Sequence, residues 1–200
     1  MRRKEREIEQ RRQEILVAAR QLFLKKGFES VSMEDIAGKA EFSRVTLYNY
    51  FKSKFDLLYE IIWEALEEDD IDFLTKVENI NSAYERLKIY AKHQYEFFLH
   101  YPGYHLLIVQ YRTYAGVQVS LSEKNLLRLH EQSEKSNNFI YNLILEGMKN
   151  GEFRKDLDPL LALNFFLKSI FAIVHPYVFD PHQNLTDLDR EIEYLLRAFV

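Results

Sequence analysis

The chain has 200 residues and 47% hydrophobic side chains, enough to bury a core, which argues against intrinsic disorder. Six Gly and four Pro are too few to supply the turns of an all-β fold, so a mostly helical protein is expected. Because the chain has no cysteine, disulfides, thiolate metal sites and a cysteine nucleophile are excluded.

The formal net charge of −4 is divided unevenly along the chain. Residues 1–54 hold 13 Lys and Arg against 8 Asp and Glu, whereas the remaining 146 residues hold 14 against 23. A basic N-terminal part on an acidic body suggests that only the first part meets a polyanion such as nucleic acid. A solvated, charged helix without a partner explains the charge alone equally well. No apolar stretch follows the charged leader, which argues against a secretory signal and predicts a cytoplasmic protein.

The N-terminal part reads as a series of helices with clear starts and stops. Apolar residues recur at helical spacing from Ile15 to Phe23, and Gly27 ends this first helix. Three serines can then each cap a new helix: Ser32, Ser43 and Ser53. The caps predict helices over residues 33–39, 44–51 and from 54 past 67, with a tight connection at 40–42. This is a helix-turn-helix with a flanking helix on each side.

The faces of these short helices also differ in character. Apolar side chains converge on one small predicted core, made of Leu22, Phe23, Phe28, Ile36, Ala37, Ala40, Phe42, Leu47 and Phe51. The other side of the 44–51 helix carries hydrogen-bonding residues at its N-terminal end and outer face, the part that enters the major groove in this motif. Polar outer faces also occur in any small helical bundle, so the pattern alone leaves that alternative open.

Beyond residue 80 the sequence predicts long helices with few breaks, over residues 83–100, 104–114, 122–149 and 160–179, and a last helix opened by Thr186. The predicted fold class is therefore all-α, with about nine helices. We expect an N-terminal helix-turn-helix DNA-binding domain at 1–54 and a C-terminal ligand-binding and dimerisation domain at 55–200.

The run SMEDIAGKAEFSRVTLYNYFKSKFDLL, residues 32–58, resembles the DNA-binding signature of the TetR family of bacterial transcriptional repressors. The run EGMKNGEFRKDLDPLLALNFFL also resembles the link between the seventh and eighth helices of that family. The resemblance spans nearly the whole chain. It implies a dimeric repressor that leaves a near-palindromic DNA operator when a small-molecule effector binds its body.

The resemblance also implies which residues contact double-stranded DNA. These are Ser32, Ser43, Arg44, Val45, Thr46, Tyr48, Asn49, Tyr50 and Lys54. Arg44 is best placed to read a base edge, because arginine can donate two bonds to guanine. The sequence departs from the family at Glu41, where glycine is usual, and we expect a turn without a left-handed glycine there. The charged leader is expected to extend the first helix or to follow the DNA backbone, with a modest electrostatic role.

The 160–179 segment is apolar almost all round. It is long enough to span a bilayer, but Lys168 lies near its centre, where insertion costs about 2.5–3.5 kcal/mol, so we expect no membrane partner. One side should pack inside its own subunit and the other against a partner. Together with the last helix it is expected to form a four-helix homodimer interface, as in the family. The predicted interface residues are Leu163, Phe166, Ile170, Leu188, Ile192, Leu195, Leu196 and Phe199.

Polar aromatic residues cluster on the middle helices, and a cavity lined by aromatic rings with a few polar tips is the usual form of a small-molecule site. The candidate effector-binding residues are Tyr90, His93, Gln94, Tyr111, Tyr141 and His175. The same rings also fit an ordinary core. In that case the body is a dimerisation or protein-interaction module without an effector.

No catalytic or metal motif stands out. No two of the six histidines have the i,i+4 spacing that places two ligands on one helical face, and phosphate loops and nucleophile elbows are absent from the sequence. We therefore expect no cofactor, no metal and no enzymatic activity. A helical enzyme or carrier with an incidental basic head remains as a third hypothesis.

Overall fold

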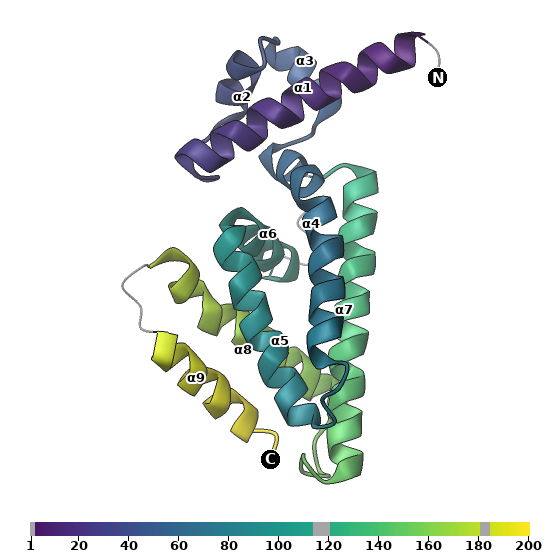
Figure 1. Cartoon of the computed structure of the whole chain (residues 1–200), viewed down its shortest axis with the longest axis vertical. Coiled ribbons are helices and arrows are strands. Elements are labelled where there is room, and N and C mark those ends of the chain that lie inside the picture. The colour runs from purple at the N-terminus through teal and green to yellow at the C-terminus, as the bar shows by residue number, and fades with distance from the viewer. Residues whose placement is uncertain (1–2, 114–120, 181–184) are drawn as a thin grey trace. The chain divides into compact units, whose positions relative to one another are not determined.

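A computed structural model describes residues 3–113, 121–180 and 185–200, and it is all-α there, as the sequence predicts (Figure 1). Nine helices lie in these ranges: α1 (Arg3–Lys26), α2 (Met33–Lys39), α3 (Arg44–Tyr50), α4 (Lys54–Val77), α5 (Ala83–His100), α6 (Pro102–Thr113), α7 (Glu123–Asn150), α8 (Pro159–Phe179) and α9 (Leu185–Arg197).

Local capping explains where most of these helices begin. Ser32 Oγ accepts a hydrogen bond from Asp35 N at 3.1 Å, and the Asp35 carboxylate accepts one from Ser32 N at 2.9 Å, which completes a capping box. Ser43 Oγ likewise accepts from Thr46 N at 3.1 Å. The predicted ranges of α2 and α5 are confirmed. The start of α9 is not, because the helix begins at Leu185, so Thr186 is its second residue and not its N-cap.

The turn between α2 and α3 contains no left-handed glycine, as expected, but it does contain a left-handed residue. Glu41 has a φ of 59°, so the turn keeps its left-handed residue even though that residue is not glycine. Phe42 N donates to Ala37 O at 3.0 Å and Glu41 N to Gly38 O at 3.3 Å, the two bonds of a Schellman motif. The hydrogen bonds that end α2 thus outweigh the strain of about 1–2 kcal/mol that a left-handed non-glycine residue carries.

Packing divides the chain into two compact units: Met1–Leu66 with Leu106–Arg128, and Glu67–His105 with Leu129–Val200. The helices α4, α6 and α7 contribute residues to both units. The division at residues 54 and 55 concerns function and stays a prediction.

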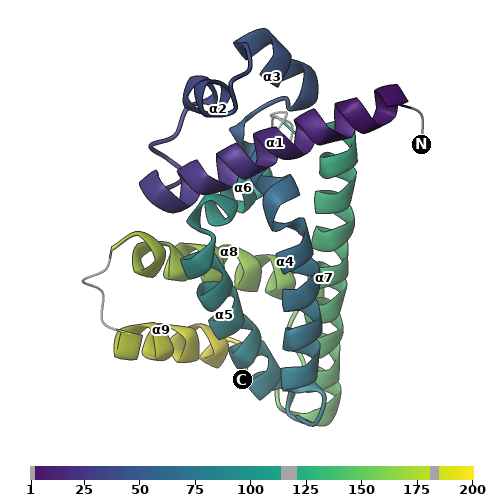
Figure 2. The ribbon, with the colours of Figure 1, turned by 45° about the horizontal axis from the view of Figure 1, so that its top comes forward.

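In the first unit, α2 packs against α1 and α3 against α2 (Figure 2). The core of this unit comprises Ile15, Ala19, Leu22, Val31, Met33, Ile36, Ala37, Leu47, Phe51 and Leu57. Three other predicted members, Phe23, Ala40 and Phe42, pack against it half-buried. Phe28 is buried beside it and contacts the Phe23 and Phe55 rings in a tilted arrangement, with ring centres 5.2 and 5.1 Å away.

In the second unit, α5, α8 and α9 pack against one another, and this corrects the predicted dimer interface. All eight predicted residues are buried inside their own chain: Leu163, Phe166, Ile170, Leu188, Ile192, Leu195, Leu196 and Phe199. The apolar stripe of α9 finds its partner in α5 and α8, so these residues are not available to a second subunit. The free side of α8 instead carries Leu161 and Phe165, which are 68% and 50% exposed. By length and composition α8 is the one described helix that could cross a membrane, with 44% of its apolar window buried in the chain.

Candidate DNA-binding surface and body pocket

The orientation of α3 follows from its one fully buried residue. Leu47 is buried in the core of the first unit and Phe51, the C-cap, is buried beside it. Since residues on the far side of a helix then face solvent, Arg44, Val45, Tyr48 and Asn49 are exposed. The side chains of Thr46 and Tyr50 are half-buried, and Tyr50 packs against the core. The exposed part of the predicted recognition surface therefore centres on the first two turns of α3.

Arg44 is held by two neighbours. Its Nη1 lies 2.7 Å from Oε1 of Glu34, a residue of α2, and its guanidinium carbon lies 5.6 Å from the centre of the Tyr48 ring. Both ion-pair side chains are more than half exposed. The Arg44 side chain is thus held by one neighbour on α2 and one on α3.

Other predicted DNA-contact residues have structural roles of their own. Ser32 Oγ donates to Asp35 Oδ2 at 2.5 Å, and Ser43 Oγ lies 2.8 Å from Thr46 Oγ1. The hydrogen bonds from the Ser32 hydroxyl and amide lower the pKa of Asp35. A carboxylate therefore lies at the start of α2, where the resemblance implies a phosphate contact from Ser32.

Lys54 is largely engaged within the first unit. Its ammonium donates to the carbonyl oxygens of Phe28 at 2.8 Å and Glu29 at 3.1 Å, and lies 4.4 Å from the centre of the Phe28 ring. Partial burial lowers the pKa of Lys54, against the raising effect of the Glu29 charge. Two of its three N–H groups already have acceptors, which leaves one for a phosphate.

The sequence predicted that Ser53 caps α4, and the structure adds a role for Asp56 that the sequence did not predict. Ser53 Oγ does accept from Asp56 N at 3.1 Å. The Asp56 carboxylate, however, is buried and accepts bonds from Lys52 N at 3.1 Å and from three donors at 2.8 Å, namely Ser122 N, Ser122 Oγ and Asn125 Nδ2. It joins the segment after the recognition helix to the start of α7. No sequence pattern signalled a contact between residues 66 to 69 positions apart.

Glu60, one turn further along α4, collects basic side chains from α1 and α7. Its carboxylate lies 2.5 Å from Arg12 Nη2, 3.1 Å from Lys124 Nζ and 3.7 Å from Arg128 Nη1. Burial raises the pKa of Glu60, but the bonds and charges of Arg12 and Lys124 outweigh this and lower it. The leader does extend α1, as one alternative had it, and Arg12 faces the protein: its guanidinium also lies 5.4 Å from the Phe51 ring centre.

The second unit contains a cavity of about 110 Å³ between α4, α5 and α7, which run alongside one another in both views (Figures 1 and 2). It is lined by Asp69, Asp70, Phe73, Leu74, Tyr90, His93, Gln94, Gln132, Lys135, Ser136 and Phe139. Three of the six predicted effector residues, Tyr90, His93 and Gln94, line it. Tyr141 and His175 do not, and the Tyr111 side chain lies outside the described residues.

Most charges of this cavity are balanced by neighbours. His93 Nε2 lies 3.0 Å from Asp69 Oδ2, and Lys135 Nζ lies 2.8 Å from Asp70 Oδ2. The Phe73 and Phe139 rings meet edge to face at 5.2 Å and form an apolar wall. What remains for a ligand is an aromatic slot with neutral polar groups at its edge.

His175 lies in a different cluster of the same unit. Its Nδ1 is 3.0 Å from Nε2 of His105, which is fully buried among aromatic rings, the nearest being Phe98 at 4.6 Å. Burial, followed by repulsion from His175, lowers the pKa of His105 from 6.5 to about 4. His105 is therefore neutral at physiological pH.

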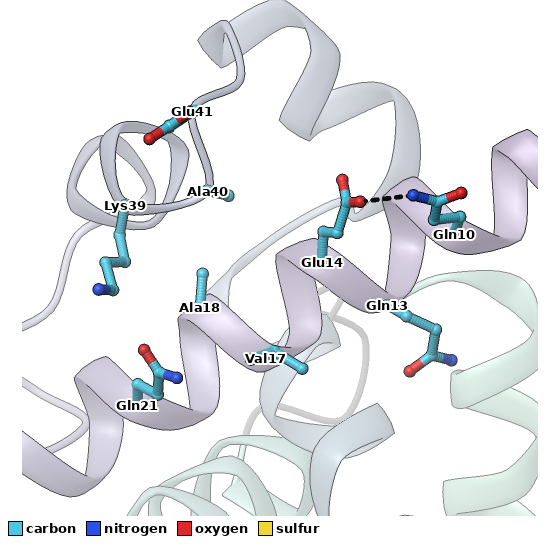
Figure 3. Close-up of a pocket in the computed structure, with 9 residues that line it drawn as sticks. All are labelled: Gln10, Gln13, Glu14, Val17, Ala18, Gln21, Lys39, Ala40 and Glu41. Atoms are coloured by element: carbon cyan, nitrogen blue, oxygen red, sulfur yellow. Dashed lines mark hydrogen bonds between the residues drawn. The ribbon is translucent and has the colours of Figure 1, made fainter.

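A second, wider hollow of about 640 Å³ lies in the first unit between α1 and the end of α2 (Figure 3). Six of its nine lining residues are polar or charged, with Gln10 donating to Glu14 at 3.0 Å, and it holds none of the predicted site residues. Within the described parts of the chain, no group of three or more His, Asp or Glu residues could hold a metal ion.

The capped helix-turn-helix, its exposed recognition helix and the helical body define a DNA-binding regulator. Residues 15–61 match the family described as bacterial regulatory proteins, tetR family. The chain is 24% identical over 171 residues to the HTH-type transcriptional repressor KstR2 of Mycobacterium tuberculosis (strain CDC 1551 / Oshkosh), covering 86% of this chain and 83% of that protein. These findings confirm the predicted resemblance: the chain is similar to the TetR family of bacterial transcriptional regulators, and its residues 15–61 match the DNA-binding domain of that family.

Solved structures show the same fold. FadR from Bacillus subtilis in complex with stearoyl-CoA matches with a TM-score of 0.59 and 22% identity, over 92% of this chain and 95% of that one. AibR in complex with isovaleryl coenzyme A and operator DNA matches with a TM-score of 0.63 and 21% identity, over 94% of this chain and 97% of that one.

Replacing Asp56 by alanine should destabilise the protein by on the order of 3 kcal/mol, because several buried donors lose their acceptor at about 1–3 kcal/mol each. Chemical unfolding followed by circular dichroism measures the loss. Asp187→Ala, which removes an exposed carboxylate from α9, is the control and should cost less than about 0.5 kcal/mol. An Asp56→Ala variant as stable as the control would show that the carboxylate does not hold the segment after α3 to the start of α7.

Acid should destabilise the second unit through His105. The unfolded chain binds a proton at this residue below its ordinary pKa near 6.5, whereas the folded chain binds one only near 4, so stability falls as the pH drops between these values. The loss approaches about 3 kcal/mol at pH 4. A His105→Asn variant should lose this part of the pH dependence of unfolding, while His130→Asn, at an exposed position, should keep it. Identical pH profiles for His105→Asn and the unaltered chain would contradict this.

Proposed function

We propose that the protein is a cytoplasmic, dimeric transcriptional repressor that binds a near-palindromic operator and is released from it by a small-molecule effector. The observation that carries the DNA-binding part is the geometry of α3. Its cap and buried Leu47 fix the helix, and its first turns present Arg44, Val45, Tyr48 and Asn49 to solvent. A short helix with exposed hydrogen-bonding side chains at its N-terminal end fits the major groove.

The proposed contacts divide by chemistry. Arg44 reads a guanine through two N–H donors, and Val45, which is 73% exposed, offers methyl groups to a thymine. Tyr48 and Asn49 lie on the same exposed side of α3, and Thr46 and Tyr50 at its edges. Ser32, Ser43 and Lys54 already form hydrogen bonds within the protein, so only their remaining donors can contact phosphates. We therefore expect them to contribute less to DNA affinity than Arg44.

Dimerisation is proposed through the free side of α8. Leu161 and Phe165 lie one turn apart there and are exposed, and Tyr194 of α9 is a further large exposed ring. Exposed apolar side chains on an otherwise buried helix are typical of a subunit interface. Two-fold pairing would set the two recognition helices about 34–36 Å apart, one turn of DNA.

The effector is proposed to be a coenzyme A thioester with a short or aromatic acyl group. The two structural neighbours described above were solved with stearoyl-CoA and isovaleryl coenzyme A. A dry cavity of about 150 Å³ is known to hold benzene, so the cavity of about 110 Å³ here suits a small acyl group better than a long chain. Phe73 and Phe139 would contact the acyl carbons, while Gln94 offers a polar group. Effector and operator would then oppose each other by linkage.

Selection from a random duplex library should enrich one near-palindromic sequence, and its affinity should fall steeply with salt because phosphate contacts release counterions. Arg44→Ala should cost about 1–3 kcal/mol and abolish the preference for guanine at one position of each half-site. Arg154→Ala, at an exposed arginine of the second unit, is the matched control and should leave both unchanged. A chain that enriches no sequence at low salt, or that stays monomeric by light scattering, would contradict the proposal.

Filling the cavity should separate effector binding from DNA binding. Leu74 lines the cavity and is half-exposed, so Leu74→Phe adds bulk there without removing a buried residue, and we expect it to weaken isovaleryl-CoA binding about tenfold. Leu145→Phe on α7, similarly exposed and outside the cavity, is the control. Fluorescence of Trp63, the sole tryptophan, with operator present and absent reads out both equilibria. If no acyl-CoA releases the operator, the body acts without this effector class.

A further inference from the structure

An acidic side chain lies on the surface that the proposed function turns toward DNA. Glu34 is the second residue of α2, its side chain is more than half exposed, and its Oε1 lies 2.7 Å from Arg44 Nη1. A carboxylate beside a polyanion is repelled, so its presence lowers the affinity for every duplex equally. Glu34 also lies in the first turn of α2, where an acidic residue stabilises the helix, and its ion pair with Arg44 places it where it can affect the choice between sequences.

The bond from Glu34 restricts an otherwise long and mobile side chain. Arginine carries five N–H donors in a planar fork, and a guanine needs two of them. The carboxylate of Glu34 lies beside Nη1, so this ion pair faces only one nitrogen of the fork. The Tyr48 ring, with its centre 5.6 Å from the guanidinium carbon, limits the position of the same group from the α3 side.

We propose that Glu34 is a positioning residue for base readout. It fixes the guanidinium plane of Arg44 so that the remaining donors match guanine. Arg44 then binds a base selectively, where an unrestrained arginine would bind phosphates of any sequence. The proposal rests on the proposed DNA-binding function and deepens it. A free arginine can turn to a phosphate oxygen, whereas an arginine already paired with a carboxylate gains less from a second anion and keeps the orientation that a base edge requires.

This role predicts opposite changes in affinity and specificity. Glu34→Gln removes the negative charge and weakens the charge-assisted bond to Arg44, while the side chain keeps its size. Binding to unrelated duplex should rise about two- to threefold at low salt, because one repulsive charge is gone. Discrimination for guanine at the Arg44 position, roughly 5- to 150-fold for a good bidentate contact, should fall at least about threefold.

The experiment is library selection followed by titration of matched duplexes that differ only at the base pair whose preference Arg44→Ala abolishes. Glu14→Gln, which removes an exposed charge from α1 in the same unit, is the charge-matched control and should leave the preference at that base pair unchanged. Arg44→Lys tests the coupling, since lysine keeps the charge but lacks the fork. In that background Glu34→Gln should change no base preference. Thermal unfolding of each variant confirms that the fold is kept.

Three outcomes are distinguishable. A loss of preference confined to the Arg44 position, absent from the Arg44→Lys background, supports the positioning role. Uniformly tighter binding of Glu34→Gln with an unchanged sequence preference overturns it, since Glu34 is then only a repulsive charge, and leaves the proposed function intact. An unaltered chain that enriches no sequence overturns both.

Discussion

The buried carboxylate of Asp56 is the interaction on which the first unit depends. A charge can stay in a protein interior only if enough donors replace the water it has lost. Asp56 receives its donors from two segments far apart in sequence, Lys52 directly after the recognition helix and Ser122 with Asn125 at the start of α7. The unit around the helix-turn-helix therefore includes the beginning of α7 as well as α1 to α3. Glu60 strengthens the same joint one turn further on, with basic partners on α1 and α7.

Most of the fold could be predicted because short-range signals in the sequence determine where the helices begin and end. Serine caps, a glycine stop and the helical spacing of apolar residues are short-range signals, and they placed α2 and α5 at their observed bounds. The turn at Glu41 shows the limit of such rules. The sequence predicted a turn without a left-handed glycine, but it did not predict that Glu41 itself takes the left-handed conformation. Phe42 packs against the core and its amide closes the Schellman motif, so the tertiary structure decides the local conformation.

The sites were less predictable, because they depend on which surfaces meet. A stripe such as that of α9 shows that a helix is covered on one side, but it does not distinguish a cover within the chain from one in a second subunit. The stripe residues Leu188, Ile192 and Leu195 are covered by their own chain, and the free residues of α8 had no special pattern. The same holds for polar aromatics: Tyr90 and His93 reach a cavity, whereas His175 pairs with His105 in a closed cluster. Nothing in the sequence around Asp56 indicated its contacts with Ser122 and Asn125.

The strength of the Asp56 joint also bears on how a repressor of this design would respond to an effector. Coupling between two ligands of one protein amounts to about 1–3 kcal/mol. A joint weaker than this would break locally when the body changed, and the recognition helix would not move. A carboxylate with four hydrogen-bonding donors, whose loss we put at on the order of 3 kcal/mol, is comparable to the upper end of that coupling. If a displacement reached the start of α7, the Asp56 hydrogen bonds would carry it to the segment that follows α3, as long as moving that segment costs less than breaking these bonds.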